Sequence, residues 1–193
     1  MFTGIIEVLG VIQQIKPEGS NIHFTISAPF TQELQVDQSI AHNGICLTVV
    51  SINDNEYTVT AIEETLNKTA MKSWNVGDAV NLERCMPADG RFDGHIVQGH
   101  IDTIGTCSAI EERNGSWVFE FNYTSNDLTV EKGSITVNGT SLTVVDSKDD
   151  NFSVHVIPYT YEHTVFHQLK VGDPVNLEFD IIGKYVSALL DKR

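Results

Sequence analysis

The sequence predicts an all-β protein made of two tandem homologous barrels and a short C-terminal α-helix. Three observations support this fold class. The chain repeats itself at a spacing of 95 residues, so that the stretch that begins at Ser39 recurs at Ser134. Both repeats contain short stretches in which apolar and polar residues alternate, as in half-buried strands. After Asp180 the pattern changes to the period of an α-helix.

The repeat divides the chain into two domains. The stretch Ser39–Val50 recurs as Ser134–Val145, and no insertion or deletion interrupts the register on either side. A repeat of this length is longer than a solenoid unit and matches one small domain. We therefore expect an N-terminal domain over 1–92 and a C-terminal domain over 93–180, joined head to tail.

Each domain is expected to be a small closed barrel. Alternating strands are predicted at Asn21–Ile26 and Glu56–Ile62, and again at Trp117–Phe121 and Phe152–Val156. Several short strands separated by Gly and Asn turns favour a barrel, because closure leaves no sheet edge exposed. The one clear helical stretch in the first half is Glu64–Thr69.

The residues 181–193 are expected to form a helix of about three turns. Ile182, Val186 and Leu189 fall on one side of it. A helix this short is not stable in water unless it packs on something. The pattern leaves open whether this helix packs on its own barrel or on copies of itself in an oligomer.

Composition excludes several classes of function. The formal net charge is −14, and the 12 Lys and Arg residues form no patch, which argues against nucleic acid and against an anionic membrane surface. No stretch approaches the length of a spanning helix, and the N-terminus lacks the basic start of a signal peptide. The three cysteines form no CxxC pair, which favours a reducing compartment. We expect a cytoplasmic location.

Function is best sought where the two copies differ. Cys46 corresponds to Ser141, and Ile5 corresponds to His100. Thr48 and Thr143 lie two residues beyond the Cys/Ser position, and their hydroxyls are expected on the same face of the strand. Two equivalent pockets that diverged in this way would suit a protein in which one half binds a donor molecule and the other half binds an acceptor.

His95 and His100 are the two histidines near the start of the second repeat. If this stretch is a strand, residues five apart face opposite sides, so a shared metal is not expected. A buried, hydrogen-bonded structural role is the ordinary interpretation of either histidine. His100 is the stronger candidate for chemistry, because the corresponding Ile5 shows that packing does not require a polar residue there. No metal motif or phosphate-binding loop is present.

Four motifs together resemble the riboflavin synthase family of lumazine-binding double-barrel proteins. They are Met1–Glu7, Ala41–Val49, Gly94–Ile101 and Gly139–Val144. They occur in the family's order, and the resemblance runs from residue 1 to about residue 186.

The resemblance implies a fold, an assembly and a reaction. Each subunit would have two six-stranded Greek-key barrels, and the C-terminal helix would help to hold a homotrimer. Two molecules of 6,7-dimethyl-8-ribityllumazine would give riboflavin and 5-amino-6-ribitylamino-uracil by transfer of a four-carbon unit, without cofactor or metal. Association with lumazine synthase is a further expectation of this kind.

The resemblance also implies which residues form the site. His100 would transfer protons, with Ser141, Thr143 and Cys46 as further catalytic residues. The positions that correspond to ligand-contacting segments are Gly4, Ile5, Ile6, Cys46, Leu47, Thr48, Thr60, Ala61, Ile62, Glu63, Glu64, Thr65, Gly99, His100, Ile101, Lys132, Ser141, Leu142, Thr143, His155, Val156, Ile157, Pro158, Tyr159 and Thr160.

One departure from the family pattern is Tyr159, which stands where many relatives carry Glu and where the first half has Glu64. A lumazine-binding antenna protein, which binds the ligand without turnover, is the main alternative to an enzyme. A purely structural double barrel is a third interpretation. The presence of Cys46, His100 and Ser141 together favours the enzyme.

Overall fold

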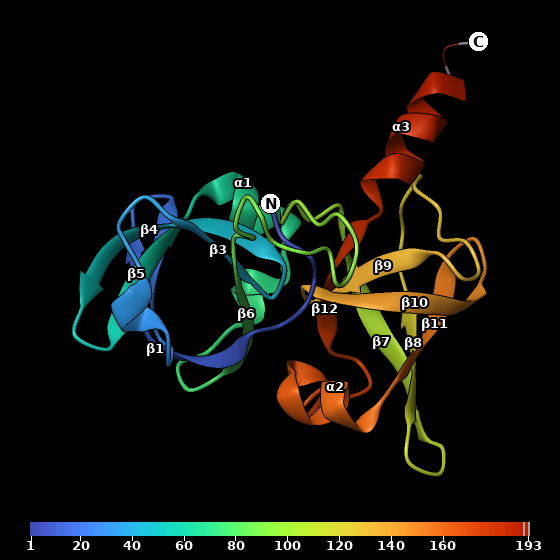
Figure 1. The fold of residues 1–193 in the computed structure, drawn as a ribbon, viewed down its shortest axis with the longest axis horizontal. Helices are drawn as coiled ribbons and strands as arrows, with labels where there is room; N and C mark the ends of the chain where they lie inside the picture. The colour runs from blue at the N-terminus through green and yellow to red at the C-terminus, as the bar shows by residue number, and fades with distance from the viewer. Residues whose placement is uncertain (191, 193) are drawn as a thin grey trace.

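The computed structural model describes residues 1–190 and residue 192. Two closed barrels lie side by side, and a helix at the C-terminus extends away from them (Figure 1). All strand pairs are antiparallel in both barrels. The predicted all-β fold class with two six-stranded barrels is confirmed.

The two barrels have the same strand order. In the first barrel the ring runs β1-β2-β5-β4-β3-β6, and in the second the equivalent strands follow each other in the same way. Sequence neighbours β2 and β3 are separated in the ring, which is a Greek-key connection. The first barrel contains β1 (Val8–Glu18), β2 (Asn21–Ser27), β3 (Ser39–His42), β4 (Ile45–Asn53), β5 (Glu56–Ala61) and β6 (Ala79–Arg84). The second contains β7 (Thr103–Glu112), β8 (Trp117–Asn122), β9 (Ser134–Val137), β10 (Thr140–Ser147), β11 (Asn151–Val156) and β12 (Pro174–Phe179).

The described residues also form three short α-helices. Helix α1 (Glu63–Lys68) follows β5, and α2 (Pro158–His163) follows β11 at the equivalent place. A proline in the first turn suits α2, because the first N–H groups of a helix have no partner within it. Helix α3 covers Ile181–Leu190. Single 3-10 turns occur at Thr31–Glu33, Ala70–Ser73 and Val165–His167.

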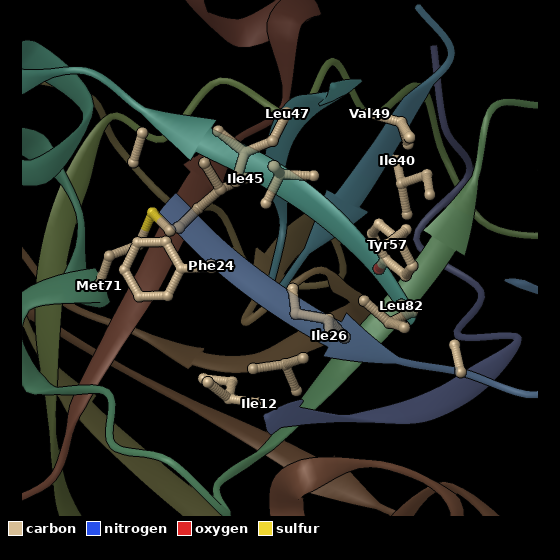
Figure 2. Close-up of a cluster of buried hydrophobic side chains, with 14 of the residues drawn as sticks. Ile12, Phe24, Ile26, Ile40, Ile45, Leu47, Val49, Tyr57, Met71 and Leu82 are labelled. Atoms are coloured by element: carbon tan, nitrogen blue, oxygen red, sulfur yellow. The ribbon is translucent and has the colours of Figure 1, made fainter. Parts of the chain in front are cut away.

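Each barrel encloses its own apolar core. Figure 2 shows the first core, where alternate residues of the strands point inward and pack with Met71 and Tyr57. The second core is richer in aromatic rings, including Phe119, Phe121 and Phe152. Each fully buried side chain of this size contributes about 1.5–3 kcal/mol to folding, so either core can hold its barrel closed.

Buried carboxamides join the two barrels. The Asn81 Nδ2 donates to the carbonyl of Asn138 at 2.8 Å, and the equivalent Asn176 Nδ2 donates to the carbonyl of Asn43 at 3.0 Å. Their Oδ1 atoms accept from the backbone of the opposite barrel, Asn81 from Val165 and Asn176 from Ala70. The contacts are reciprocal, so the barrels are related by an approximate twofold axis.

Helix α3 makes little contact with the rest of the chain. None of its residues is buried, and its apolar side chains Tyr185, Leu189 and Leu190 are more than 60% exposed. Its base is fixed by an ion pair from Lys184 Nζ to Asp102 at 2.6 Å. The structure therefore excludes packing of this helix on its own barrel, one of the two possibilities that the sequence left open. No helix in the described part of the chain is long and apolar enough to cross a membrane.

A buried histidine distinguishes the first core from the second. His42 Nδ1 lies 3.0 Å from the carbonyl of Ile40, which can only accept, so Nδ1 carries the proton. The Tyr57 hydroxyl then donates to Nε2 at 2.8 Å. Val137 and Phe152 occupy the equivalent positions in the second barrel. Burial lowers the pKa of His42 from 6.5 to about 4.

This histidine predicts a loss of stability in mild acid. In the unfolded chain His42 becomes protonated below about pH 6.5, whereas in the folded chain it becomes protonated only below about pH 4. The unfolded state thus binds more protons in this window, and stability falls by about 3 kcal/mol as the pH drops through it. Urea unfolding of the protein and of His42→Asn at pH 4, 5, 6 and 7 measures the contribution. The two pH profiles should differ in slope between pH 4 and 6.5, and parallel profiles would contradict the assignment.

Candidate functional site

The segments that precede the barrels meet at the approximate twofold axis. We call Met1–Ile6 the first arm and His95–Ile101 the second arm. Phe2 and Val97, which are equivalent in the repeat, form an isolated antiparallel bridge with N–H to carbonyl distances of 2.8 and 3.1 Å. The second arm is thus not the regular strand that the sequence argument on His95 and His100 assumed.

Each arm then crosses to the barrel of the other domain. The carbonyl of Gly4 in the first arm accepts from the backbone N–H of Ser141 in the second barrel at 2.8 Å. The carbonyl of Gly99 in the second arm accepts from the N–H of Cys46 in the first barrel at 2.9 Å. The Cys/Ser position singled out from the repeat is therefore where the exchanged arms attach.

These crossings bring most of the predicted site residues together in two equivalent places. Strands β4 and β5 pair with Val49 opposite Val59, so the start of β4 lies beside the end of β5. We call the two places the first and second junctions. The first junction consists of Cys46–Thr48, Thr60–Thr65 and Gly99–Ile101. The second consists of Ser141–Thr143, His155–Thr160 and Gly4–Ile6.

Close backbone approach at the junctions requires glycine. Gly4 and Gly99 have φ values of +79° and +80°, a region that other residues rarely adopt. A Cβ on Gly99 would lie 2.6 Å from the Cβ of Cys46, and a Cβ on Gly4 would lie 2.6 Å from the Cβ of Ser141. Both distances are too short for any side chain.

A buried glutamate in the last strand of each barrel holds the arm of the same domain. Glu178 of β12 accepts from the N–H groups of Gln98, Gly99 and His100 at 2.6, 2.9 and 3.0 Å. Glu83 of β6 accepts in the same way from the first arm. Burial raises the pKa of Glu83 and of Glu178, and these donors oppose the shift by stabilising the carboxylates.

The first junction presents a thiol and hydroxyls. Cys46 is half-buried and Thr48 is exposed. Burial raises the pKa of the Cys46 thiol, and the Ser39 hydroxyl beside it partly offsets that shift. Ile101 of the second arm packs against the core of the first barrel. The thiol is therefore largely neutral near pH 7 and is not an activated nucleophile.

The second junction contains a serine–histidine pair. His95 Nδ1 lies 2.7 Å from Ser141 Oγ, and its Nε2 lies 3.2 Å from Thr136 Oγ1. Burial lowers the pKa of His95, and the charge of Asp180 partly offsets this. The imidazole is neutral and can exchange a proton with Ser141. Among the described residues, no carboxylate is hydrogen-bonded to it, so they form no acyl-transfer triad.

Sequence reasoning missed His95 and the two glutamates. His95 has no counterpart in the first repeat, so comparison of the halves could not show whether a polar residue was needed there. Glu83 and Glu178 offered a usable signal, because the same acidic residue follows Val-Asn-Leu in the last strand of both copies. A carboxylate kept at a buried position needs hydrogen-bond partners, here the N–H groups of the arms.

His100 and Lys132 are two predicted residues with basic side chains that are exposed, one in the second arm and one beside β10. The His100 side chain is exposed, while its backbone N–H is bound to Glu178. Lys132 is exposed in the loop before β9 and has a φ of +65°. Its N–H donates to the carbonyl of Val144 at 2.9 Å, which places its backbone beside β10, next to the Ser141–Thr143 segment of the second junction.

Helix α2 at the second junction carries aromatic side chains that stack on neighbouring rings. Tyr159 is 68% exposed and stacks on His163, with ring centroids 4.1 Å apart. Tyr161, on the same helix, stacks on Trp117 at 3.8 Å. The first junction has Glu64 at the position of Tyr159. The exposed edge of the first junction at α1 is therefore acidic, whereas that of the second junction at α2 is aromatic.

Two hollows of the surface lie almost entirely outside the junctions. One of about 690 Å³ lies on the first barrel between β3, β6 and the segment after β6, and Ile5 alone of the predicted residues lines it. One of about 270 Å³ lies between the barrels beside Asn43 and Asn138. Within the described residues, no group of three His, Cys, Asp or Glu side chains is placed to hold a metal. In one chain the junctions are open surfaces.

Comparison with known proteins identifies the family. A model of the lumazine binding domain matches the chain twice, at residues 3–85 and 98–180. The chain is 45% identical over 197 residues to riboflavin synthase from Actinobacillus pleuropneumoniae and 43% identical over 196 residues to that from Bacillus amyloliquefaciens. Each alignment covers 100% of this chain and 91% of the relative. The chain belongs to the riboflavin synthase family.

Solved structures with this fold carry ligands. A LumP structure complexed with riboflavin aligns with a TM-score of 0.84 and 25% identity over 93% of this chain and 99% of that protein. A LumP structure complexed with 6,7-dimethyl-8-(1'-D-ribityl) lumazine aligns with a TM-score of 0.84 and 24% identity over 92% of this chain and 98% of that protein. The two matches to the lumazine binding domain coincide with the two barrels and their arms, as expected for an enzyme of the riboflavin synthase type.

The arm contact predicts a large cost for a methyl group at Gly99. Gly99→Ala combines left-handed backbone strain of about 1–2 kcal/mol with overpacking against Cys46 of about 1–3 kcal/mol. Gly19→Ala is the matched control, since Gly19 has a φ of +61° and no atom within 4 Å of an added Cβ. In urea unfolding Gly99→Ala should lose more stability than Gly19→Ala. Equal losses would show that the arm does not lie on Cys46.

Proposed function

We propose that this chain converts two molecules of 6,7-dimethyl-8-ribityllumazine into riboflavin and 5-amino-6-ribitylamino-uracil, without a cofactor. The observation that carries the proposal is the pair of equivalent junctions with different side chains. A reaction between two copies of one substrate needs two similar binding places. A transfer from one copy to the other needs those places to differ, as Cys46 differs from Ser141.

The chemistry depends on the acidity of the substrate. Loss of a proton from the C7 methyl group gives an anion that the ring system stabilises, and carbon–carbon bond formation with the second molecule gives a pentacyclic adduct. Elimination from the adduct yields both products. The protein's part is to hold two flat rings face to face and to move protons.

The junctions supply groups for both tasks. Backbone N–H and carbonyl groups of the arms and of β4 and β10 suit the pyrimidine edge, and the hydroxyls of Thr48 and Thr143 suit the ribityl chain. His100 is the proposed proton carrier, because its exposed ring can reach solvent and substrate while Glu178 fixes its backbone. Ser141 with its neutral partner His95 provides a second route for a proton.

A single chain leaves this site incomplete. The junctions are open to solvent, with Ile62 and Ile157 55% and 59% exposed, whereas the proposed reaction needs two rings enclosed away from water. The exposed apolar residues of α3 need a partner for the helix to be stable. We propose a homotrimer in which the first barrel of one subunit faces the second barrel of its neighbour.

Location and further partners remain predictions. Cys46, Cys85 and Cys107 are free thiols, which agrees with the expected cytoplasmic compartment. Association with lumazine synthase is proposed only from the resemblance.

The second candidate function is binding of lumazine or riboflavin without turnover. The fold shared with the LumP complexes favours it, as does Tyr159 in place of the carboxylate found at Glu64. Incubation with 6,7-dimethyl-8-ribityllumazine alone separates the two functions. Riboflavin formed at one molecule per two lumazines consumed supports the enzyme, and binding with no riboflavin supports the second function.

If His100 carries protons, its removal should slow turnover while substrate still binds. We expect His100→Ala to lower kcat by ~100-fold or more, with little change in the affinity for riboflavin. His167→Ala is the control, since His167 is exposed in the turn Val165–His167, binds the carbonyl of Thr164 and belongs to neither junction. A loss below about threefold in the absorbance assay would remove His100 from the mechanism.

If α3 joins the subunits, a chain that ends at residue 182 should sediment as a smaller species than the full chain. Leu189→Glu, which adds a charge to the apolar side of the helix, should also shift the protein toward the smaller species, and it does so without removing any residues. A full-size oligomer in both variants would refute this role of the helix.

A further inference from the structure

Each buried glutamate connects two different parts of the molecule. Glu178 is 1% exposed and lies on β12 of the second barrel. Its two carboxylate oxygens accept from three successive backbone N–H groups of the second arm, at 2.6 to 3.0 Å. Such an arrangement fixes the path of the arm as well as its position, because each N–H has a set direction.

The arm that Glu178 binds continues onto the first barrel, not onto the second barrel to which Glu178 belongs. Beyond the glutamate, the Gly99 carbonyl binds the Cys46 N–H, and a Cβ added to Gly99 would lie 2.6 Å from the Cys46 Cβ. Ile101 then packs on the core of the first barrel. A carboxylate in the second barrel therefore determines where the arm lies at the first junction.

The converse holds for Glu83. It is 5% exposed, lies on β6 of the first barrel, and accepts from the Thr3 N–H, the Thr3 hydroxyl and the Gly4 N–H at 2.6, 2.8 and 2.9 Å. Gly4 then binds Ser141 of the second barrel. A carboxylate of the first barrel therefore fixes the arm that reaches the second junction.

We propose that Glu178 and Glu83 are crossed positioning residues, each setting the geometry of the ligand-binding junction on the barrel to which it does not belong. This inference rests on the proposed function, which takes the junctions as the ligand sites. Neither glutamate reaches the reacting atoms. Each acts through the arm whose backbone it binds.

Replacement of the carboxylate by a carboxamide tests the device with almost no change in volume. A glutamine offers one acceptor oxygen and turns an NH₂ donor toward the N–H groups of the arm. At least one of the three hydrogen bonds is then lost, and the arm detaches more often. A general structural defect would loosen both junctions alike. Under the proposal, loss of the Glu178 carboxylate loosens only the first junction, and loss of the Glu83 carboxylate loosens only the second.

Thiol labelling reports on the two junctions separately. Cys46 is the native thiol under the second arm, and Ser141→Cys places a matched thiol under the first arm. In this background we would measure rates of reaction with iodoacetamide by peptide mass spectrometry for Glu178→Gln and Glu83→Gln. Cys107, which is 0% exposed in the second core, is the internal control for global opening.

Glu178→Gln should raise the labelling rate of Cys46 by about fivefold, the change that the loss of one ordinary hydrogen bond gives, and leave the thiol at position 141 unchanged. Glu83→Gln should give the reverse pattern. Equal increases at both positions, or no increase at either, would overturn the inference. If Glu178→Gln does not fold, Glu178→Asp, which keeps the charge but shortens the reach, is measured in its place.

Riboflavin then tests the link to the ligand sites. In the Ser141→Cys parent it should protect both thiols, and when Glu178→Gln is added the concentration that half-protects Cys46 should rise about fivefold with no change at position 141. Crossed labelling with unchanged half-protection at both thiols would overturn the positioning role. Failure of riboflavin to protect either thiol in the parent protein would instead overturn the proposed sites.

Discussion

The reciprocal carboxamide contact between the barrels is the constraint on which the rest of the structure depends. Asn81 and Asn176 each donate to a carbonyl of the opposite barrel and accept an N–H from it, in a region closed to water. A buried polar group left without its partner costs about 1–3 kcal/mol, so any sliding or rotation of the barrels would break several such bonds at once. The barrels therefore have one relative placement.

That placement brings backbone against backbone at the axis. The Asn-Gly turns of the two β-hairpins meet there, and a Cβ on Gly44 or Gly139 would lie 2.8 or 2.6 Å from the backbone of the other turn. With the hairpins this close, the Phe2 and Val97 segments can pair and continue onto opposite barrels. Each junction is consequently built from both halves of the chain, and neither half contains a whole junction.

Much of the fold could be predicted from the sequence, because it rests on local patterns. Alternation gave the strands around Phe24 and Phe119, and the repeat gave the equivalence of Cys46 and Ser141. The crossing of the arms could not be predicted, since a short apolar segment pairs equally well with either barrel on local grounds. The partnership of His95 with Ser141 depends on that crossing, which is why the sequence pointed to His100 first.

The exchange of arms also bears on how such a chain arose. The pairing of Phe2 with Val97 and the contacts of Asn81 and Asn176 are equivalent in the repeat, so two identical single-barrel chains could have met in the same way, each extending its first residues onto the other. Fusion of two copies of that gene needs only the short stretch after β6 to connect them, visible in Figure 1 between the barrels. Once fused, the two lending segments were free to mutate independently, and a symmetrical pair of identical pockets could become an unequal pair.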